Sequence, residues 1–196
     1  MHTAPSLDDA VGLRAPLVFA GLVLLVFGFG YALIGSGLVG VLFPAAANGS
    51  LVERDGRVVG SALVAQPFVD ARYFRPRPSA AGYDPMAAAG SNQARSNPDL
   101  RKRLDAAVAD IAAHEGVAAD EVPLDLATQS GSGLDPDISP AAARVQIARV
   151  ARARGLAPAQ VARVVETMTE APQFGVLGEP RVNVLRLNLA LDALPH

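Results

Sequence analysis

The sequence contains no cysteine among its 196 residues. Thiolates ligate most structural zinc sites and supply redox pairs and cysteine nucleophiles, so these three chemistries are excluded. The lack of disulfides does not fix the compartment, because a domain of ordinary size folds without them on either side of a membrane. The three histidines, His2, His114 and His196, have no metal-ligand spacing, and we expect no metal site.

Basic residues show no excess. Lys and Arg number 17 against 19 Asp and Glu, which gives a formal net charge of −2. Without a basic field, nucleic acid is not an expected partner. The only lysine is Lys102, so the chain also has no phosphate-binding loop of the type that needs a lysine directly after its second glycine.

No charged residue occurs between Arg14 and Glu53. The apolar run at 17–43 would form a helix about 40 Å long, which exceeds the ~30 Å hydrocarbon core of a bilayer. We therefore predict a retained transmembrane helix over residues 15–44, surrounded by membrane lipid. A cleaved signal peptide is the alternative, because residues 45–47 resemble a cleavage site, but the apolar core of a signal peptide is only about 7–15 residues long.

Glycines recur every seven residues within this run, at Gly21, Gly28 and Gly35. That spacing keeps them on one side of an α-helix, where small residues let a second membrane helix approach closely. We interpret the three glycines as a helix-packing surface. The alternative is that membrane helices are simply rich in glycine.

The flanks of the run do not fix its orientation. Arg14 precedes it together with two aspartates, while Arg54 and Arg57 follow it, so the distribution of positive charge is ambiguous. The predicted organisation is a short N-terminal tail at 1–14, the membrane helix at 15–44 and one domain at 45–196.

The domain is predicted to be α+β. An Asp-Gly turn at 55–56 between apolar runs predicts a β-hairpin within 51–64. Capping pairs and closing glycines predict helices from Asn97 to Gly116 and from Ser139 to Gly155. A third helix is expected from about Pro158 to Pro172, and alternation within 178–192 predicts a late strand or strand pair.

Arginines and aromatic residues are mixed within Arg72–Pro78, where Pro76 and Pro78 favour an extended backbone. A nucleic-acid or phosphate contact is one interpretation of this pattern. We favour the other, in which these side chains hold a loop against the core through cation–π contacts.

A glycine-serine loop, Ser130-Gly131-Ser132-Gly133, precedes the helix that begins at Ser139. Glycine-rich turns at a helix N-terminus are typical of anion sites. Ser130 or Ser132 with Asp135 and His114 would form a nominal hydrolase triad, but no nucleophile-elbow pattern surrounds either serine. We therefore predict no catalytic residue, and a membrane-anchored hydrolase remains the alternative from another functional class.

Several longer motifs resemble the C subunits of bacterial Kdp high-affinity potassium-transporting ATPases. The matching segments are the N-terminal span, Gly60–Ser61, Leu63–Val64, Gln66–Phe68, Tyr73–Phe74, Arg77–Ala80, Ser91–Asn92, Ser96–Pro98, Asp125–Leu126, Thr128, Ser130–Pro136, Ile138–Ser139, Val182–Val184 and Leu187–Asp192. They cover nearly the whole chain in the family's order.

The resemblance implies a non-catalytic subunit of a complex that also contains a pore-forming, potassium-channel-like subunit and a P-type ATPase subunit. It further implies a cell inner-membrane protein with a cytoplasmic N-terminus and an extracytoplasmic domain. The family is described as a catalytic chaperone that raises the affinity of the ATPase subunit for ATP.

A glutamine proposed to touch nucleotide in this family falls on Gln146, after the loop formed by Ser130, Gly131, Ser132 and Gly133. ATP is cytoplasmic, so a domain outside the membrane would act on ATP only through coupling across the membrane helices. We expect no cofactor held by the chain itself, with ATP bound through the complex. The alternative is an external cap on the pore subunit that gates or steadies potassium entry.

Overall fold

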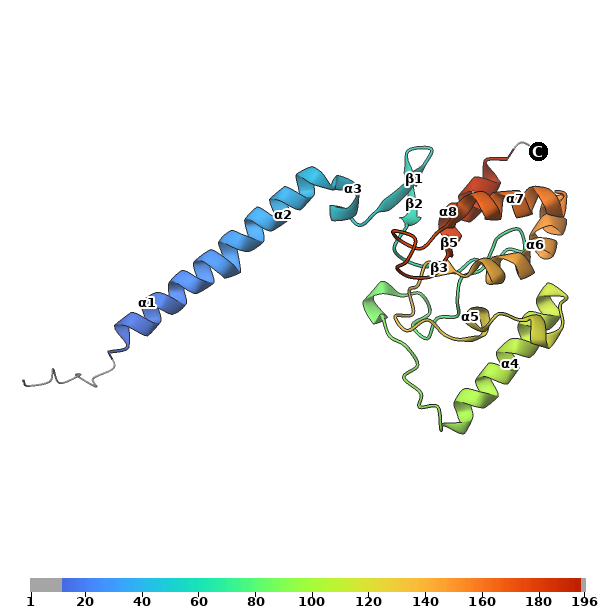
Figure 1. Cartoon of the computed structure of the whole chain (residues 1–196), viewed down its shortest axis with the longest axis horizontal. Helices are drawn as coiled ribbons and strands as arrows, with labels where there is room; N and C mark the ends of the chain where they lie inside the picture. The colour runs from blue at the N-terminus through green and yellow to red at the C-terminus, as the bar shows by residue number, and fades with distance from the viewer. Residues whose placement is uncertain (1–11, 195–196) are drawn as a thin grey trace, which may run out of the picture. The chain divides into compact units, whose positions relative to one another are not determined.

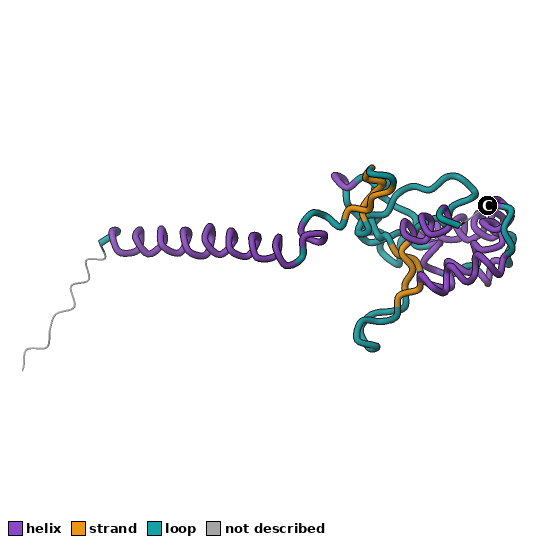
Figure 2. Tube along the Cα trace, turned by 90° about the horizontal axis from the view of Figure 1, so that it is seen from above, coloured by secondary structure: helices purple, strands orange, loops and turns teal. Residues whose placement is uncertain are grey.

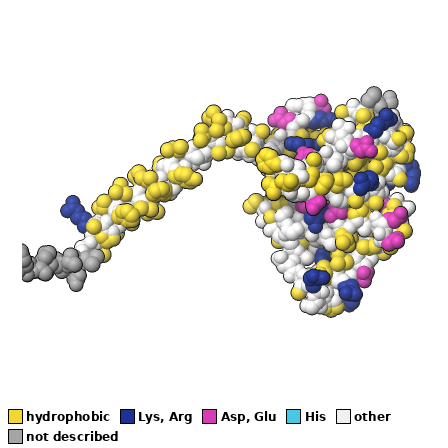
Figure 3. Space-filling view, viewed as in Figure 1, with side chains coloured by type: hydrophobic (Ala, Val, Ile, Leu, Met, Phe, Trp, Pro, Cys, Tyr) yellow, Lys and Arg dark blue, Asp and Glu magenta, His cyan; other side chains and the backbone are white. Residues whose placement is uncertain are grey.

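The computed structural model describes residues 12–194, which form two units that divide at Gly49 (Figure 1). His2, His196 and most of the predicted tail lie outside the described residues. The first unit is a helix of 29 residues, Arg14–Leu42, with a mean hydropathy of 2.5. Its apolar side chains are exposed along its length (Figure 3), as expected for a helix that contacts lipid. The helix is compatible with a single-pass membrane protein.

The apolar helix is not α-helical throughout. It consists of α1 (Arg14–Val23), a π-helical segment η1 (Leu24–Gly30) and α2 (Tyr31–Leu42), and the short α3 (Pro44–Ala47) follows. A π-helix has more residues per turn than an α-helix, so each residue of η1 rotates less around the axis. Gly28 and Gly35 are therefore displaced around the helix from the line that a heptad spacing predicts.

The second unit begins with the predicted hairpin. Strands β1 (Leu51–Arg54) and β2 (Arg57–Ser61) are antiparallel and joined at Asp55 and Gly56, which have φ of 53° and 71°. Positive φ at both central positions is the geometry of the favoured two-residue hairpin turn, as the Asp-Gly pair indicates. The second strand ends at Ser61, so the hairpin is shorter than the apolar sequence to residue 64 allows.

Two of the predicted helices have the expected ends. Helix α4 (Pro98–Glu115) begins at the Asn97 cap and ends at Gly116, while α6 (Pro140–Arg154) begins at the Ser139 cap and ends at Gly155. Between them lie the single turns η3 (Ala119–Glu121) and α5 (Leu124–Ala127), and before them η2 (Pro85–Ala87). Both closing glycines are left-handed, which a residue with a Cβ adopts only with strain.

The C-terminal region departs from the prediction. Helix α7 (Pro158–Met168) ends four residues before Pro172, because β4 (Thr169–Glu170) pairs with β5 (Arg181–Asn183). The predicted late strand is limited to β5, and α8 (Val184–Asp192) follows it directly. Asn183 caps α8 by accepting a hydrogen bond from the Arg186 N–H. The strand prediction is therefore correct for 181–183 and wrong for 184–189, where buried leucines at helical spacing produce a similar pattern.

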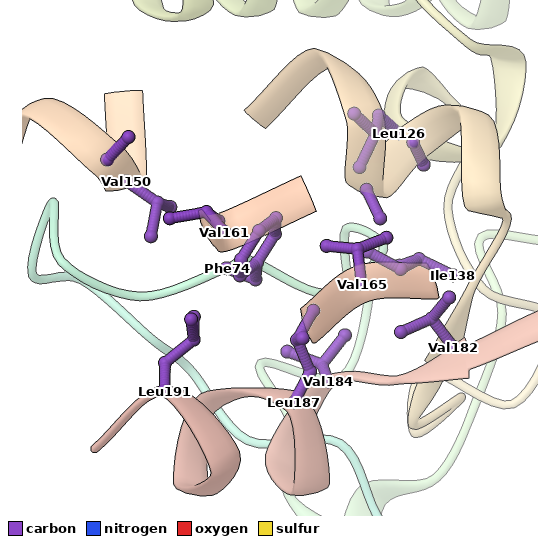
Figure 4. Close-up of a cluster of buried hydrophobic side chains, with 13 residues drawn as sticks. Phe74, Leu126, Ile138, Val150, Val161, Val165, Val182, Val184, Leu187 and Leu191 are labelled. Carbon is purple, nitrogen blue, oxygen red and sulfur yellow. The ribbon is translucent and has the colours of Figure 1, made fainter. Parts of the chain in front are cut away.

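A small antiparallel sheet and three helices enclose the core. Strand β3 (Asp137–Ile138) pairs with β5, which gives the order β3-β5-β4. Side chains from this sheet and from α6, α7 and α8 meet around Phe74, which is fully buried although it lies on an extended segment (Figure 4). The domain is α+β, as predicted.

Candidate functional site

The Tyr73–Arg75 segment is held by side-chain amides from two helices. Asn188 of α8 accepts a hydrogen bond from the Phe74 N–H at 2.8 Å and donates to the Phe74 carbonyl at 3.0 Å. Gln146 of α6 makes the same pair of bonds with Arg75, at 2.8 and 3.1 Å. Both amides are buried, so they replace the partner strand that this extended backbone lacks.

Gln146 has no free hydrogen-bonding capacity in this arrangement. Its Oε1 also accepts a bond from Arg149 Nη2 at 2.8 Å, and its Nε2 also donates to the Ala142 carbonyl at 3.2 Å. An amide side chain has two donors and two acceptor positions, and all four are used. With 1% of its surface exposed, Gln146 shapes the domain in this structure.

Arg149 joins the extended segment to a buried ion pair. Its Nε contacts both carboxylate oxygens of Glu115 at 3.0 and 2.9 Å, and its Nη1 donates to the carbonyls of Ala71 and Tyr73. The side chains of Arg149 and Glu115 are 7% and 4% exposed. Removing one member of a buried ion pair leaves an uncompensated charge, so this pair ties α4 to α6.

A second charge cluster connects the hairpin to the helices. Asp192 of α8 accepts bonds of 2.7 Å from both Arg54 of β1 and Arg154 of α6. Burial acts to raise the pKa of Asp192, but the hydrogen bonds from Arg154 and Arg54 outweigh it and hold the pKa below its ordinary value. The Arg154 guanidinium also lies over the ring of Tyr73, 5.2 Å from its centroid.

The arginines of the basic-aromatic segment bind the domain itself, but mostly through an ion pair and hydrogen bonds and not through the expected cation–π contacts with the core. Arg72 lies over the Tyr73 ring at 5.9 Å. Arg77 pairs with Asp135 at 3.0 Å and also donates to the carbonyl of Gln129 at 3.3 Å. The arginines of this segment therefore bind the domain's own backbone, carboxylates and rings.

The glycine-serine loop packs tightly against that segment. Ser79 Oγ donates to the Gly133 carbonyl at 2.6 Å, and the Ser130 N–H donates to the Pro78 carbonyl at 2.9 Å. Gly133 has φ of 73°, and a Cβ there would lie 2.8 Å from the Ala89 carbonyl oxygen. A Cβ at Gly90 would likewise lie 2.7 Å from the Gly131 carbonyl oxygen. Glycine is required here for close contact between two backbones.

The N-terminus of α6 is occupied by a carboxylate of the chain itself. Asp125 accepts hydrogen bonds from the Ser139 N–H at 2.8 Å and from the Ser139 hydroxyl at 3.2 Å. Ser139 in turn accepts a bond from the Ala142 N–H at 3.0 Å. The anion position that the sequence pattern indicates is thus filled from within the domain.

The residues of the nominal triad are not assembled as a nucleophile and base. Ser130 is 2% exposed, and its hydroxyl accepts bonds from the N–H groups of Gly133 and Asp135. His114 lies on the exposed side of α4, and within residues 12–194 no hydrogen bond joins it to Ser130, Ser132 or Asp135. The same part of the chain contains no cluster of three potential metal ligands.

A pocket of about 380 Å³ lies between α4 and the extended segment. Phe68, Pro76 and Ile111 line it together with the polar side chains of Arg75 and His114. Tyr83 also borders it, and burial raises the pKa of its hydroxyl, which donates to the Arg77 carbonyl at 3.0 Å. The pocket is mostly apolar, so it suits an apolar group better than a polyphosphate.

Comparisons with the sequences of known proteins identify the family of this chain. A model of the family described as "KdpC: K+-transporting ATPase, c chain" matches residues 13–193. This chain belongs to the KdpC family. A potassium-transporting ATPase KdpC subunit of Xanthomonas axonopodis pv. citri is 62% identical over 189 residues, which cover 96% of this chain and 91% of the relative.

Two further KdpC subunits are similar to this chain over nearly their whole length. One from Xanthomonas campestris pv. campestris strain B100 is 59% identical over 192 residues, 98% of this chain and 92% of the relative. One from Shewanella putrefaciens is 50% identical over 194 residues, 99% and 96% of the two chains. As a member of the KdpC family, the chain is an accessory subunit of a potassium-transporting ATPase and is not itself catalytic.

Sequence reasoning missed the residues that organise this region. Asn188, Arg149, Glu115 and Asp192 were not selected as site residues. Asn188 interrupts a run of leucines, and a polar residue among buried apolar positions is the signal that could have identified it. Arg149 is buried although arginine is mostly an exposed residue type, and no local pattern marks it as a buried member of α6.

Proposed function

We propose that this chain is the non-catalytic subunit of an ATP-driven potassium uptake complex in the cell inner membrane. In this proposal its single span lies beside a pore-forming, potassium-channel-like subunit and a P-type ATPase subunit. The N-terminus is cytoplasmic and the domain at 45–196 is extracytoplasmic. Family membership over residues 13–193 is the observation that carries this conclusion.

We further propose that the chain raises the affinity of the ATPase subunit for ATP without touching nucleotide. Two contacts support this: the Gln146 amide is fully used within the domain, and Asp125 occupies the α6 N-terminus. Ser130, Gly131, Ser132 and Gly133 would then be nucleotide-related only through the shape of the domain. An effect on ATP affinity from this position is a coupling free energy between distant sites.

A second candidate role is that of an external cap that gates or steadies potassium entry. The observation that favours it is the apolar loop between β4 and β5, whose side chains are exposed and available for a partner. The two roles are compatible, because a cap that changes conformation with the pore could also bias the ATPase subunit.

Protease access would test the topology. The turn at Gly116, which ends α4, is exposed, so a protease recognition sequence inserted there should be cut without first unfolding the domain. We expect cleavage when protease is added outside cells whose outer membrane has been opened. Cleavage only after the inner membrane is broken would place the domain in the cytoplasm and contradict the proposal.

The ATP dependence of hydrolysis would test the coupling. Complex purified with this chain should reach half its maximal rate at a lower ATP concentration than complex from which the chain has been removed. Size-exclusion chromatography should first show that both preparations are intact. Equal ATP dependence of the two would then contradict a role in ATP affinity, and the external cap would remain as the candidate role.

A further inference from the structure

The loop between β4 and β5 forms a projecting apolar arm, defined here as residues 171–180. Figure 2 shows it as the loop that extends from the β4–β5 strands away from the rest of the domain. Its three largest apolar side chains, Phe174, Val176 and Leu177, are 84%, 79% and 57% exposed. Such a concentration of exposed apolar surface marks an interaction site.

The arm has a defined conformation. Gln173 and Leu177 exchange two backbone hydrogen bonds of 2.8 and 2.9 Å across its tip. At its base, Arg181 pairs with Glu170 at 2.8 Å and with Asp137 at 3.2 Å. A loop that is held by such contacts loses less conformational entropy on binding than an unstructured one, which favours association.

The backbone at the tip is strained. Phe174 has φ of 56°, and Gly175 follows with φ of 78°. A bulky residue rarely adopts a left-handed conformation, and such strain is found mostly at functional positions. Here the strain places an aromatic side chain at the most exposed part of the arm.

The charges of the arm favour a protein over a lipid surface. Residues 171–178 carry no charge, and Glu179 follows them. Within residues 12–194 Glu179 has no ion-pair partner, whereas Glu170 and Arg181 neutralise each other. Lipid-binding segments use basic residues with Trp or Tyr at the interface, and a free carboxylate is repelled by anionic lipid.

We propose that the apolar arm inserts into an apolar socket on another subunit of the transport complex, with a basic group of that subunit opposite Glu179. The inference rests on the proposed function, since it requires that the chain assemble with other subunits. It adds the contact surface, the anchor residue Phe174 and the chemistry of the partner site. Aromatic anchors in well-packed pockets contribute most of the binding energy of typical interfaces.

Replacing the tip side chains would test the arm. A chain with Phe174→Ser, Val176→Ser and Leu177→Ser should keep its thermal unfolding midpoint, because these side chains have few contacts within the chain. Recovery of the other subunits with the tagged chain should fall about tenfold or more, the loss expected for interface hot spots. The matched control is Val69→Ser with Leu124→Ser, which removes apolar side chains that are 83% and 75% exposed elsewhere on the domain.

Cross-linking identifies the occupant. A photoreactive phenylalanine analogue at position 174 of this chain, in the assembled complex, should form an adduct with another polypeptide.

Reversing the charge beside the arm tests the basic group of the partner. Glu179→Arg should lower subunit recovery, while Glu53→Arg on the exposed β1 strand should not. Adducts with lipid alone, or full recovery with the serine variant, would overturn the arm proposal while leaving the proposed function intact. Failure of the unaltered chain to recover any other subunit would overturn both.

Discussion

The side-chain amide of Gln146 pairs with the backbone of Arg75 as a neighbouring strand would, with its oxygen 2.8 Å from the N–H and its nitrogen 3.1 Å from the carbonyl oxygen. Asn188 does the same for Phe74, the preceding residue. Side chains of the two helices α6 and α8 therefore hydrogen-bond to the backbone of consecutive residues in one extended segment. Since the segment leads into the contacts of Arg77 and Ser79 with the glycine-serine loop, these two amides position most of the candidate site.

Gln146→Ala should destabilise the domain. It leaves the partly buried N–H and carbonyl of Arg75 without partners and removes one acceptor from the buried Arg149. Each unsatisfied buried group costs about 1–3 kcal/mol. We expect a loss of about 2–4 kcal/mol in the free energy of unfolding, measured by urea unfolding of the full chain in detergent micelles. Arg144→Ala on the exposed side of α6 is the control and should change it by less than about 0.5 kcal/mol.

The same variant separates a structural role from a nucleotide contact. At a temperature where Gln146→Ala remains folded, the assembled complex should keep its ATP dependence. A raised half-saturating ATP concentration in intact complex, with no change for Asn188→Ala, would instead indicate that Gln146 contacts nucleotide.

Much of the fold followed from local sequence signals. These signals are the helix caps Asn97 and Ser139, the closing glycines Gly116 and Gly155, and the Asp-Gly turn. They act through backbone geometry within a few residues, so they could be recognised without tertiary information. The C-terminal helix could not, because its leucines are buried on more than one side against α7 and β5. Their sequence pattern therefore fits a strand as well as a helix.

Gly133 and Gly131 should respond differently to alanine. Gly133→Ala forces a side chain into left-handed backbone and against the Ala89 carbonyl, so we expect a loss of more than about 1 kcal/mol in unfolding free energy. A Cβ at Gly131 would meet no heavy atom within 4 Å in the described residues, and Gly131→Ala should be nearly neutral. Urea unfolding of both variants checks this, and equal losses would contradict the close backbone contact at Gly133.

Asp192 should make stability depend on acidity. Its pKa in the folded domain lies below the ordinary value of 3.8, so its ion pairs with Arg54 and Arg154 stabilise the domain above that value. The stabilisation is lost as the pH falls through the lowered pKa. Asp192→Asn should reduce the unfolding free energy by about 1 kcal/mol at pH 7, after allowance for solvent screening.

The difference between Asp192→Asn and the unaltered chain should begin to shrink as the pH falls below about 4, where the unfolded chain takes up the proton, and it should vanish below the lowered pKa of the folded state, where both chains lack the carboxylate charge. Chemical unfolding at pH 7, 5, 4 and 3 would show it. Asp105→Asn on the exposed side of α4 is the matched control. A difference for Asp192→Asn that is constant over this range would mean that its charge does not stabilise the fold.

The membrane glycines offer a matched pair on one α-helical segment. Gly35 and Gly37 of α2 lie about 200° apart around the axis, and a Cβ at either meets no heavy atom within 4 Å in the described chain. If Gly35 faces a partner helix, Gly35→Leu should lower recovery of the other subunits severalfold and Gly37→Leu should not. Recovery measured in detergent checks this. An equal effect of both variants would contradict a packing surface formed by Gly21, Gly28 and Gly35.

The candidate site was less predictable than the fold. The family resemblance indicated Gln146, and the glycine-serine pattern indicated the Ser130–Gly133 loop as a candidate anion site. Local pattern could not show that Asp125, fourteen residues before Ser139, fills the α6 N-terminus. Nor could it show that Glu115 and Arg149, 34 residues apart, form a buried pair. Such contacts depend on how helices pack, and no short-range spacing encodes them.

The hydrogen bonds from Asn188 and Gln146 to the Phe74–Arg75 backbone have a consequence for solubility. An extended segment with free peptide groups is a template for pairing with another chain, and exposed edges of this kind lead to aggregation. Here the peptide groups bond to side-chain amides, which have no further backbone groups to which an incoming strand could add. The peptide groups of Phe74 and Arg75 are thus not available for pairing with a strand of a second molecule.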